Sequence, residues 1–397
     1  MKILRHAALA LFLVPVGCGS STPEPETAPP PPASTPAPVA SAPPPEPTPP
    51  PPPEPTAEEK AKAAAAKALA DDRATWEAEA KAEDARWTAD LHGEAKALAS
   101  AKYASTKVGV TAILKGHHRQ PGHADRDKYR HPVETLEFWG VTPTSNVLEI
   151  GPGEGWYTEI LAPLLATKGH LSVTASNPDG PADQRSTFYG QRLKKFLDRS
   201  PELYGKVDRI LFDSKAPDLK QEGKLDVIIV ARAMHGLHRD KLLNGFLAEM
   251  YKGLKVGGVL AIEQHRAKDD ANPDEVSKNG YLPQKWLIEQ IEAAGFKLAG
   301  KPSEVNANPK DTKDYAEGVW TLPPSLALKD KDKQKYVDIG ESDRMTLKFV
   351  KQKAPKAAAA ATSAPPPPAP KKKKLDNREQ RRPAGGESCW PVSFCLR

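Results

Sequence analysis

The sequence predicts an α/β domain built on a doubly wound sheet of seven strands, the last of which is antiparallel. Short apolar runs alternate with segments whose apolar residues recur at helical spacing, the pattern of parallel strands joined by helices. A long polar stretch without a good helix separates the last two runs, so we expect them to form an antiparallel pair. The expected strands are 146–150, 170–175, 207–212, 225–231, 257–263, 296–300 and 344–350.

The first strand leads into a glycine turn. The run 146–150 is apolar apart from its first residue and Glu149, which fits a parallel strand covered on both faces. Three glycines follow, at 151, 153 and 155, and allow a tight turn and a close approach to a ligand. The next segment has helical spacing, so its N-terminal amides would face that ligand. The expected helices are 156–166, 184–199, 214–221, 239–254 and 283–294.

A long helix is predicted before this domain, over 56–100. Thr56 at the cap position and Glu59 three residues later form a capping box. Five large apolar residues fall on one stripe at a period of 3.6: Leu69, Trp76, Trp87, Leu91 and Leu98. We expect the stripe to dock on the chain's own domain. The alternatives are a second copy of the chain or a membrane surface.

The two ends of the chain are expected to be disordered. The chain has 42 prolines, and they gather at the ends, which leaves a globular composition from about 105 to 351. Residues 19–55 form a proline-rich tether, and 352–397 a basic tail. That tail holds the most concentrated positive charge, so the net charge of +6 says little about the substrate. Its cysteines, Cys389 and Cys395, form either a small disulfide loop or free thiols.

The first 18 residues have the composition of a secretory leader, with a basic start, a short apolar run and small residues at the end. The apolar run, 7–16, is too short for an ordinary transmembrane helix. Cys18 follows Gly17 and resembles the lipidation cysteine of bacterial lipoproteins. We expect a cell-envelope protein tethered to the membrane through lipidated Cys18, on the periplasmic side. The alternatives are a cleaved signal, an uncleaved anchor, or a cytoplasmic protein whose leader is not functional.

The glycine turn suits a nucleotide-like ligand, and its details exclude two classes. The dinucleotide fingerprint has a third glycine where this chain has Trp156, whose ring argues against a nicotinamide or flavin cofactor. The chain has no Gly-Lys-Ser/Thr sequence, which excludes a P-loop. No Cys/His cluster has the spacing of metal ligands.

The spacing Glu-x-Gly-x-Gly-x-Gly at 149–155 resembles motif I of the class I S-adenosylmethionine-dependent methyltransferases. The segment 254–263 resembles the turn into their fifth strand. Five segments look like a bacterial group known only as predicted methyltransferases: 130–140, 155–163, 306–314, 317–324 and 339–349. The resemblance covers 105–351. It implies a Rossmann-like fold with an antiparallel seventh strand, and S-adenosylmethionine as the cofactor.

The resemblance also implies cofactor-binding residues. Gly151, Gly153 and Gly155 would give the cofactor's methionine and ribose room, and Glu149 would orient the methionine end, directly or through water or backbone.

The adenosine end of the cofactor departs from the family pattern. The acidic residue that normally ends strand two is absent, so Asn177 or Asp179 would contact the ribose. Asp213 and Ser214, after strand three, fit the position that contacts adenine, and a helix cap is the alternative for Asp213.

Methyl transfer requires an aligned acceptor and, for oxygen acceptors, removal of a proton. His265, just past strand five, is the candidate catalytic base, with His235 second; for each, an ordinary hydrogen-bonded histidine is the alternative. Arg126, Arg130 and His131 are suited to an anionic acceptor, or else they pair with nearby acids.

Two longer segments are expected near this site. Residues 231–235 follow strand four, where cofactor and acceptor usually meet in this family. The polar loop 306–324 either closes over the site or forms a structural flap over the last strands.

The predicted function is that of a methyltransferase acting on an unidentified small-molecule or membrane-associated acceptor. The alternative is an exported, non-catalytic lipoprotein that keeps the fold for ligand or partner binding. The intact motif at 149–155 favours the enzyme. The missing strand-two acid and the leader favour the alternative, because S-adenosylmethionine is a cytoplasmic metabolite. No nucleic-acid partner is expected.

Overall fold

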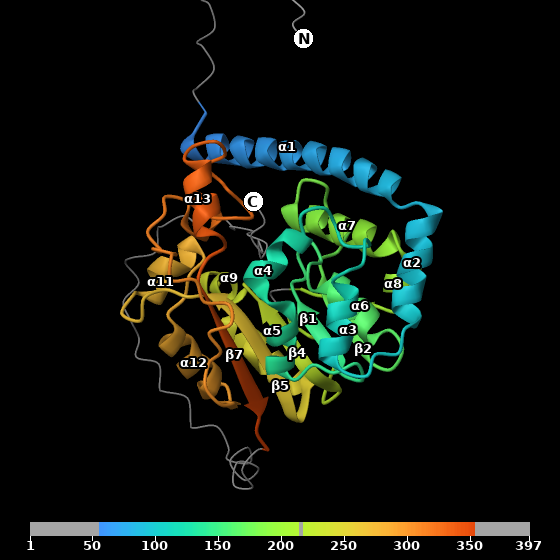
Figure 1. The fold of residues 1–397 in the computed structure, drawn as a ribbon. Helices are drawn as coiled ribbons and strands as arrows, with labels where there is room; N and C mark the ends of the chain where they lie inside the picture. The colour runs from blue at the N-terminus through green and yellow to red at the C-terminus, as the bar shows by residue number, and fades with distance from the viewer. Residues whose placement is uncertain (1–54, 214–216, 354–397) are drawn as a thin grey trace, which may run out of the picture. The chain divides into compact units, whose positions relative to one another are not determined.

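The computed structural model describes residues 55–213 and 217–353 (Figure 1). The leader with Cys18, almost all of the proline-rich tether, Ser214 and both tail cysteines lie outside the described residues. What the sequence predicts for them stays a prediction.

A sheet of seven strands forms the centre of the domain, in the order β3-β2-β1-β4-β5-β7-β6. The strands are β1 (Asn146–Ile150), β2 (His170–Ala175), β3 (Asp208–Leu211), β4 (Leu225–Ala231), β5 (Leu254–His265), β6 (Phe296–Leu298) and β7 (Arg344–Lys351). The first five pair in parallel, and β7 runs antiparallel between β5 and β6. This confirms the predicted Rossmann-like fold class and the antiparallel last pair.

The strand bounds agree closely with those predicted, and the clearest difference is at β5. This strand begins at Leu254 instead of 257, because its first residue already pairs with Leu225 at the start of β4. A shift of register then brings Val227 opposite Val259. The last residue of β5 is His265, which places this histidine at the carboxyl edge of the sheet.

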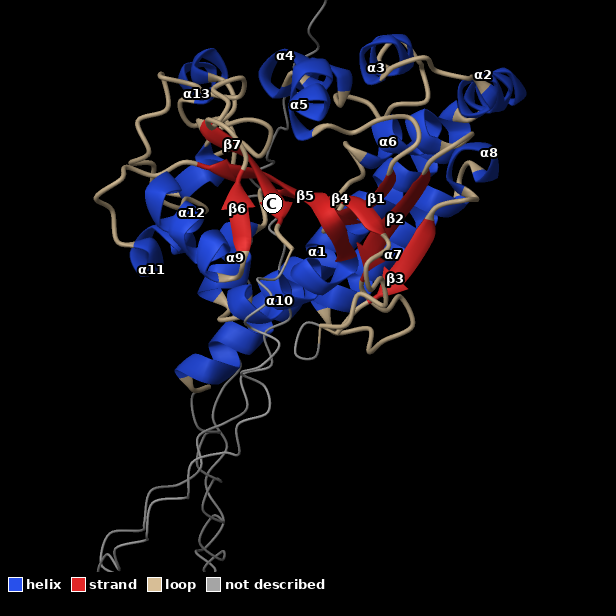
Figure 2. Cartoon of the chain, turned by 90° about the horizontal axis from the view of Figure 1, so that it is seen from below, coloured by secondary structure: helices blue, strands red, loops and turns tan. Residues whose placement is uncertain are grey.

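Helices cover both faces of the sheet (Figure 2). One layer holds α3 (Thr106–Ile113), α5 (Pro132–Trp139), α6 (Thr158–Leu165) and α7 (Arg185–Asp198), and the other α9 (Met234–Arg239), α10 (Leu243–Gly253) and α12 (Gln284–Ala293). Val147 packs in the first layer and its neighbour Leu148 in the second. Because both faces are buried, the strands read as nearly continuous apolar runs.

The connections hold the short helices α4 (Asp127–Arg130), α8 (Pro201–Tyr204), α11 (Pro273–Val276) and α13 (Lys333–Ile339). The helix predicted at 214–221 is wrong over its described part, because 217–221 form no helix. None of the helices in the described ranges is long and apolar enough to span a membrane.

The N-terminal helix begins as predicted but is shorter. Helix α1 (Ala57–Arg86) has the full capping box, in which Thr56 and Glu59 each bond the other's backbone amide. The predicted single helix is two helices, because Thr88 caps a new one, α2 (Ala89–Ser100), and accepts a hydrogen bond from the Leu91 amide. Thr88 therefore interrupts the single long helix that the high helix propensity of the flanking Ala, Glu and Lys residues favours.

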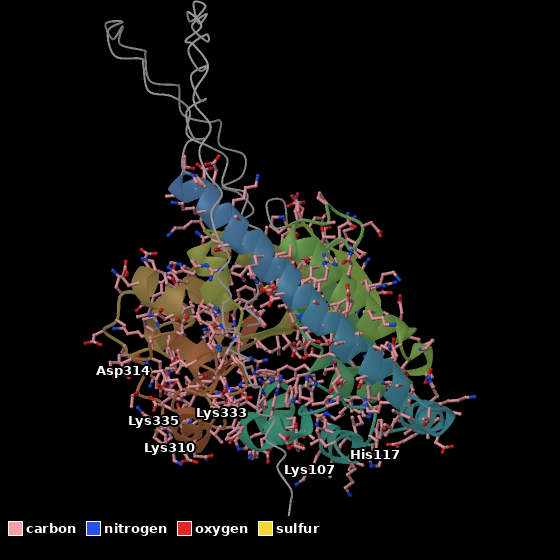
Figure 3. The ribbon with its side chains drawn as sticks, turned by 90° about the horizontal axis from the view of Figure 1, so that it is seen from above. Lys107, His117, Lys310, Asp314, Lys333 and Lys335 are labelled. Carbon is pink, nitrogen blue, oxygen red and sulfur yellow. The ribbon has the colours of Figure 1, made fainter. Side chains whose placement is uncertain are left out.

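The apolar stripe of these two helices docks on the chain's own domain, as predicted. Helix α1 crosses the domain on the side of α7 (Figures 1 and 3). The Trp76 ring meets the Phe188 ring of α7 edge-on, with centroids 5.6 Å apart. Arg73 donates a 2.7 Å hydrogen bond to Gln191 Oε1, and Asp72 pairs with Arg185 at 2.5 Å. Both partners belong to α7, so α1 is fixed to this helix by apolar and polar contacts.

Candidate functional site

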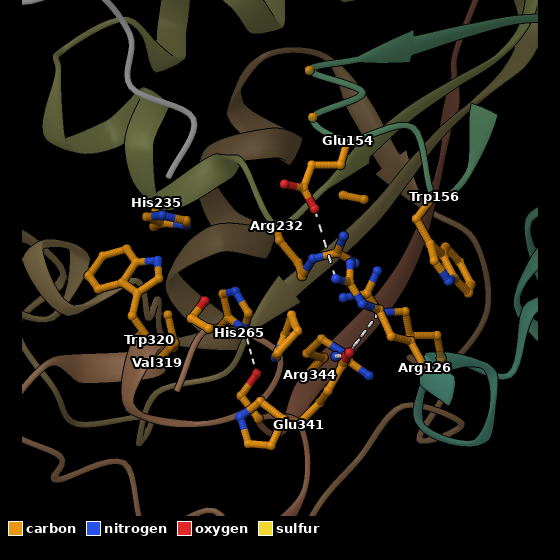
Figure 4. A pocket seen from close by; sticks show the side chains of 18 of the residues that line it. Arg126, Glu154, Trp156, Arg232, His235, His265, Val319, Trp320, Glu341 and Arg344 are labelled. Atoms are coloured by element: carbon orange, nitrogen blue, oxygen red, sulfur yellow. Dashed lines mark hydrogen bonds and ion pairs between the residues drawn. The ribbon is translucent and has the colours of Figure 1, made fainter. Parts of the chain in front are cut away.

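A pocket lies at the carboxyl edge of β1, β4 and β5 (Figure 4). Strands β1 and β4 are neighbours although not consecutive, and ligands of such sheets bind at this kind of switch point. The residues lining the pocket include Arg126, Arg130, Gly151, Gly153, Glu154, Trp156, Arg232, His235, His265, Trp320, Pro323, Glu341, Ser342 and Arg344.

The glycine turn forms one wall of the pocket. Gly151, Gly153 and Gly155 all have left-handed backbone, with φ of 64°, 59° and 84°. A side chain at Gly155 would also collide with Phe196, whose ring lies 2.6 Å from the position of a Cβ. The turn is fixed to β2, because the Gly151 amide donates a 2.8 Å hydrogen bond to Thr174 Oγ1. The sequence thus uses glycine here for conformation and for space.

Glu149 lies beneath this turn and is almost fully buried, with 3% of its surface exposed. One carboxylate oxygen accepts a 2.7 Å hydrogen bond from Thr158 Oγ1, and the other accepts none from the described residues. Burial raises the pKa of Glu149 to about 7, although Thr158 and the charge of Arg232 both oppose the shift. The carboxylate is therefore poorly compensated, and a nearby cation would stabilise it.

The residues predicted for the adenosine end lie apart from this pocket lining. Asn177, just past β2, is exposed, and its side-chain oxygen accepts a 3.0 Å hydrogen bond from the Asp179 amide. Both residues therefore belong to a local Asx turn. Asp213 follows β3 and is also exposed, while its neighbour Ser214 lies outside the described residues.

The two candidate histidines face the same pocket and lie beside each other, with ring centroids 5.9 Å apart. His265 Nδ1 lies 2.5 Å from Ser342 Oγ, and His235 Nδ1 lies 3.3 Å from Gln264 Oε1. Burial lowers the pKa of His235 to about 4. Burial, and then the neighbouring His235 and the charge of Arg232, hold the pKa of His265 well below its ordinary 6.5. Both rings are therefore neutral near pH 7.

Buried ion pairs hold the floor of the pocket. Glu341 accepts hydrogen bonds from Arg130 Nε at 2.9 and 3.0 Å and from Arg344. Glu263, on β5, pairs with Arg344 at 2.9 Å and Arg232 at 3.1 Å. Burial alone would raise the pKa of Glu341, but Arg130 and Arg344 outweigh it and lower that pKa to about 2. The acids stay charged and fix the arginines that surround them.

Trp156, whose ring argues against a dinucleotide, forms part of the pocket wall. Its Nε1 donates a 2.9 Å hydrogen bond to the His123 carbonyl. The Arg130 guanidinium lies over its ring, 4.9 Å from the centroid. The ring therefore supports Arg130 by a cation–π contact, in addition to the ion pair with Glu341.

The polar loop predicted to approach the site does so. The short helix η3 (Gly318–Thr321) and the following prolines bring Trp320, Pro323 and Pro324 to the pocket. The loop is held in place by Asp311, which accepts a 3.1 Å hydrogen bond from Tyr281 and a 2.8 Å one from the Asp343 amide. It thus forms a fixed wall of the pocket.

The structure brings Gly151, Gly153, His235 and His265 to one pocket, and leaves Glu149, Gly155, Asn177 and Asp213 outside its lining. Sequence reasoning missed Arg232, Ser342, Glu341 and Arg344. The segments 231–235 and 339–349 contain all four, so the sequence indicates the right regions without identifying the side chains within them.

Comparison with known proteins identifies similar folds only. No protein-family model and no curated protein matches the chain. A methyltransferase from Aquifex aeolicus described as S-adenosylmethionine-dependent is 21% identical over 50% of this chain and 93% of its own, with a TM-score of 0.35. The 1,6-didemethyltoxoflavin-N1-methyltransferase of Burkholderia thailandensis, solved with S-adenosylhomocysteine, is 15% identical over 64% of this chain and 93% of its own, with a TM-score of 0.35. At these scores the likeness carries no argument of its own, and the fold rests on the sheet order.

Proposed function

We propose that this protein is an S-adenosylmethionine-dependent methyltransferase acting on a small-molecule or membrane-associated acceptor. The observation that carries the proposal is the state of Glu149, a buried carboxylate with one hydrogen bond and a pKa raised to about 7. The methionine end of S-adenosylmethionine carries an ammonium and a sulfonium, which would supply the missing positive charge. Gly151 and Gly153, which follow Glu149 in the sequence, line the pocket and would let that end of the cofactor approach the backbone closely.

The bound cofactor would supply a methyl group on a positively charged sulfur. The chain's own task is to align the acceptor and to remove its proton. His265 suits the second task, because its ring is neutral and lines the pocket. If its Nδ1 donates to Ser342, its Nε2 is the nitrogen that accepts the proton. His235 contacts Gln264 and is better suited to holding the pocket wall.

Calorimetric titration of the full chain with S-adenosylhomocysteine tests the cofactor. We expect binding by the wild type and none by Gly153→Trp, whose side chain would fill the pocket. Gly223→Trp is a matched control, because Gly223 has the same φ of 59° and only open space around a Cβ. The proposal fails if the wild type gives no heat at millimolar ligand, or if both variants bind like the wild type.

The alternative is a non-catalytic binding protein with this fold, and one observation favours it. The strand-two position that would hold the cofactor's ribose carries Asn177, and its side chain is engaged with its own backbone turn. The same titration decides: ligand binding at the pocket without S-adenosylhomocysteine binding would select the alternative.

We further propose membrane attachment through Cys18, on the periplasmic side of the cell envelope. The support is the leader composition and the proline-rich tether that follows it. Cys18→Ala should move the protein from the membrane fraction to the soluble fraction, and unchanged attachment would contradict lipidation at this residue.

A further inference from the structure

We propose that the methyl acceptor of this site is an anion, held through a carboxylate or phosphate group by Arg126, Arg130 and Arg232. The inference rests on the proposed methyltransferase function and names the class of its acceptor. Arg126 and Arg130 precede α5 and Arg232 follows β4, yet all three line one pocket. Figure 4 shows Arg126 and Arg232 there.

The charge of the pocket supports an anionic ligand. Its lining carries four arginines against two glutamates, Glu154 and Glu341, and Glu263, outside the lining, pairs with two of these arginines, so the group has a net charge of +1. Arg344 is already paired within the protein, because it donates hydrogen bonds to Glu341 and the Tyr129 carbonyl and forms an ion pair with Glu263. The excess positive charge therefore belongs to the other three arginines.

Each of these three has guanidinium nitrogens with no hydrogen-bond acceptor among the described residues. Arg126 donates no side-chain hydrogen bond to them, and its nearest carboxylate oxygen, on Glu154, is 3.8 Å away. Arg130 donates to Glu341 only through Nε, so both of its terminal nitrogens have no acceptor among the described residues. Arg232 bonds the Glu263 side chain only through Nη1. Donors of this kind form the strong, paired hydrogen bonds that carboxylates and phosphates accept.

The arginines are held together at an energetic cost. Arg232 has a left-handed backbone, with φ of 57°, which is strained for a residue with a side chain. Burial, and then repulsion by Arg232, lower the pKa of Arg130 to about 10. Burial also lowers the pKa of Arg126, and the charge of Arg232 adds to the effect. A bound anion would remove this repulsion, and pre-organised charges of this kind occur at ligand sites.

The position of the arginines suits an acceptor. They line the same pocket as Gly151, Gly153 and His265, so an anion held there would lie near both the proposed cofactor subsite and the candidate base. Its negative charge would also offset the repulsion between the arginines and the sulfonium of the cofactor. We therefore expect the anion and the cofactor to favour each other's binding.

Inorganic phosphate and acetate are the probes, with acetamide as the uncharged counterpart of acetate. Each is titrated into the full chain at constant ionic strength, with and without S-adenosylhomocysteine. We expect phosphate or acetate to bind and acetamide not to. Arg126→Gln should lower the affinity for the anion about tenfold or more. Arg209→Gln is the matched control, because it removes an equal charge from an exposed position on β3.

The outcomes separate the two proposals. Both proposals are supported if the wild type binds S-adenosylhomocysteine and binds the anion more tightly than the Arg126 variant does. Whether phosphate or acetate binds more tightly then tells which anionic group the acceptor carries. Binding of S-adenosylhomocysteine with no anion binding, or equal loss in both arginine variants, overturns the anionic acceptor and leaves the methyltransferase. Anion binding without S-adenosylhomocysteine binding overturns the acceptor and the methyltransferase together.

Discussion

Protonation of Glu149 should control the affinity for the cofactor. Its pKa is about 7, because burial disfavours the charged carboxylate. The ammonium and sulfonium of the ligand favour the charged form, so the ligand binds the carboxylate and excludes the proton. Affinity should therefore rise with pH through the pKa of the free protein and level off above it.

The magnitude follows from that pKa. With a value of about 7, the carboxylate is about one-eleventh of the population at pH 6 and nearly all of it at pH 8, so affinity should differ about tenfold. The two pocket histidines add little in this range. The pKa of His235 is lowered to about 4 and that of His265 well below 6.5, so both stay neutral.

Calorimetric titration of S-adenosylhomocysteine, which keeps the ammonium, between pH 6 and pH 8 measures this effect. Glu149→Gln, which cannot titrate, should bind weakly and equally at both pH values. Thr158→Val removes the side-chain hydrogen bond that favours the carboxylate, so the midpoint should move to higher pH. The reasoning is refuted if wild-type affinity is flat over this range, or if the glutamine variant keeps the same pH dependence.

Three further predictions concern stability. Gly155→Ala should lower the unfolding free energy by about 1–3 kcal/mol more than Gly122→Ala. Both glycines have positive φ, but only the new methyl group at 155 would collide with a ring, that of Phe196. Denaturant titration measures the two losses, and equal losses would contradict this reasoning. Burial lowers the pKa of His235 in the folded protein to about 4, so the unfolding free energy should fall by about 3 kcal/mol as the pH falls from about 6.5 towards 4. The His235→Gln variant should lack this loss in thermal melts at acid pH. If the variant and the wild type lose stability equally with pH, the prediction is wrong. Trp76→Ala should cost about 2 kcal/mol and speed amide exchange in α1; unchanged exchange would show that the ring does not hold the helix.

The sheet could be predicted from the sequence because burial on both faces leaves a direct signal. β1, β2 and β4 have the predicted bounds, since their apolar runs end where the strands reach the sheet edge. The division between α1 and α2 was missed, because Thr88, which caps α2, is a single polar residue in a strongly helical composition. The absent helix at 217–221 had only weak periodicity to support it.

The site could be predicted only in part. The glycine turn follows β1, His265 ends β5, and His235 lies in the helix that follows β4, so topology alone places them at one edge. The Ser342 contact to His265 joins residues 77 positions apart, and the pairing of Arg130 with Glu341 spans 211. Nothing in local sequence fixes such partners. The charge balance of the pocket, which supports the anionic acceptor, depends on these long-range pairs.

The packing of α1 on α7 has a practical consequence for anyone who trims this protein. A chain cut at 105 keeps every strand, yet it uncovers Phe188 and removes the Arg73 contacts to Gln191 and to the carbonyl of Ala182. That carbonyl belongs to the loop after β2, which also contains Asn177, the residue proposed to contact the cofactor's ribose. Weak ligand binding by such a fragment would therefore reflect the loss of the contacts between α1 and the rest of the domain. It would not measure the affinity of the intact protein.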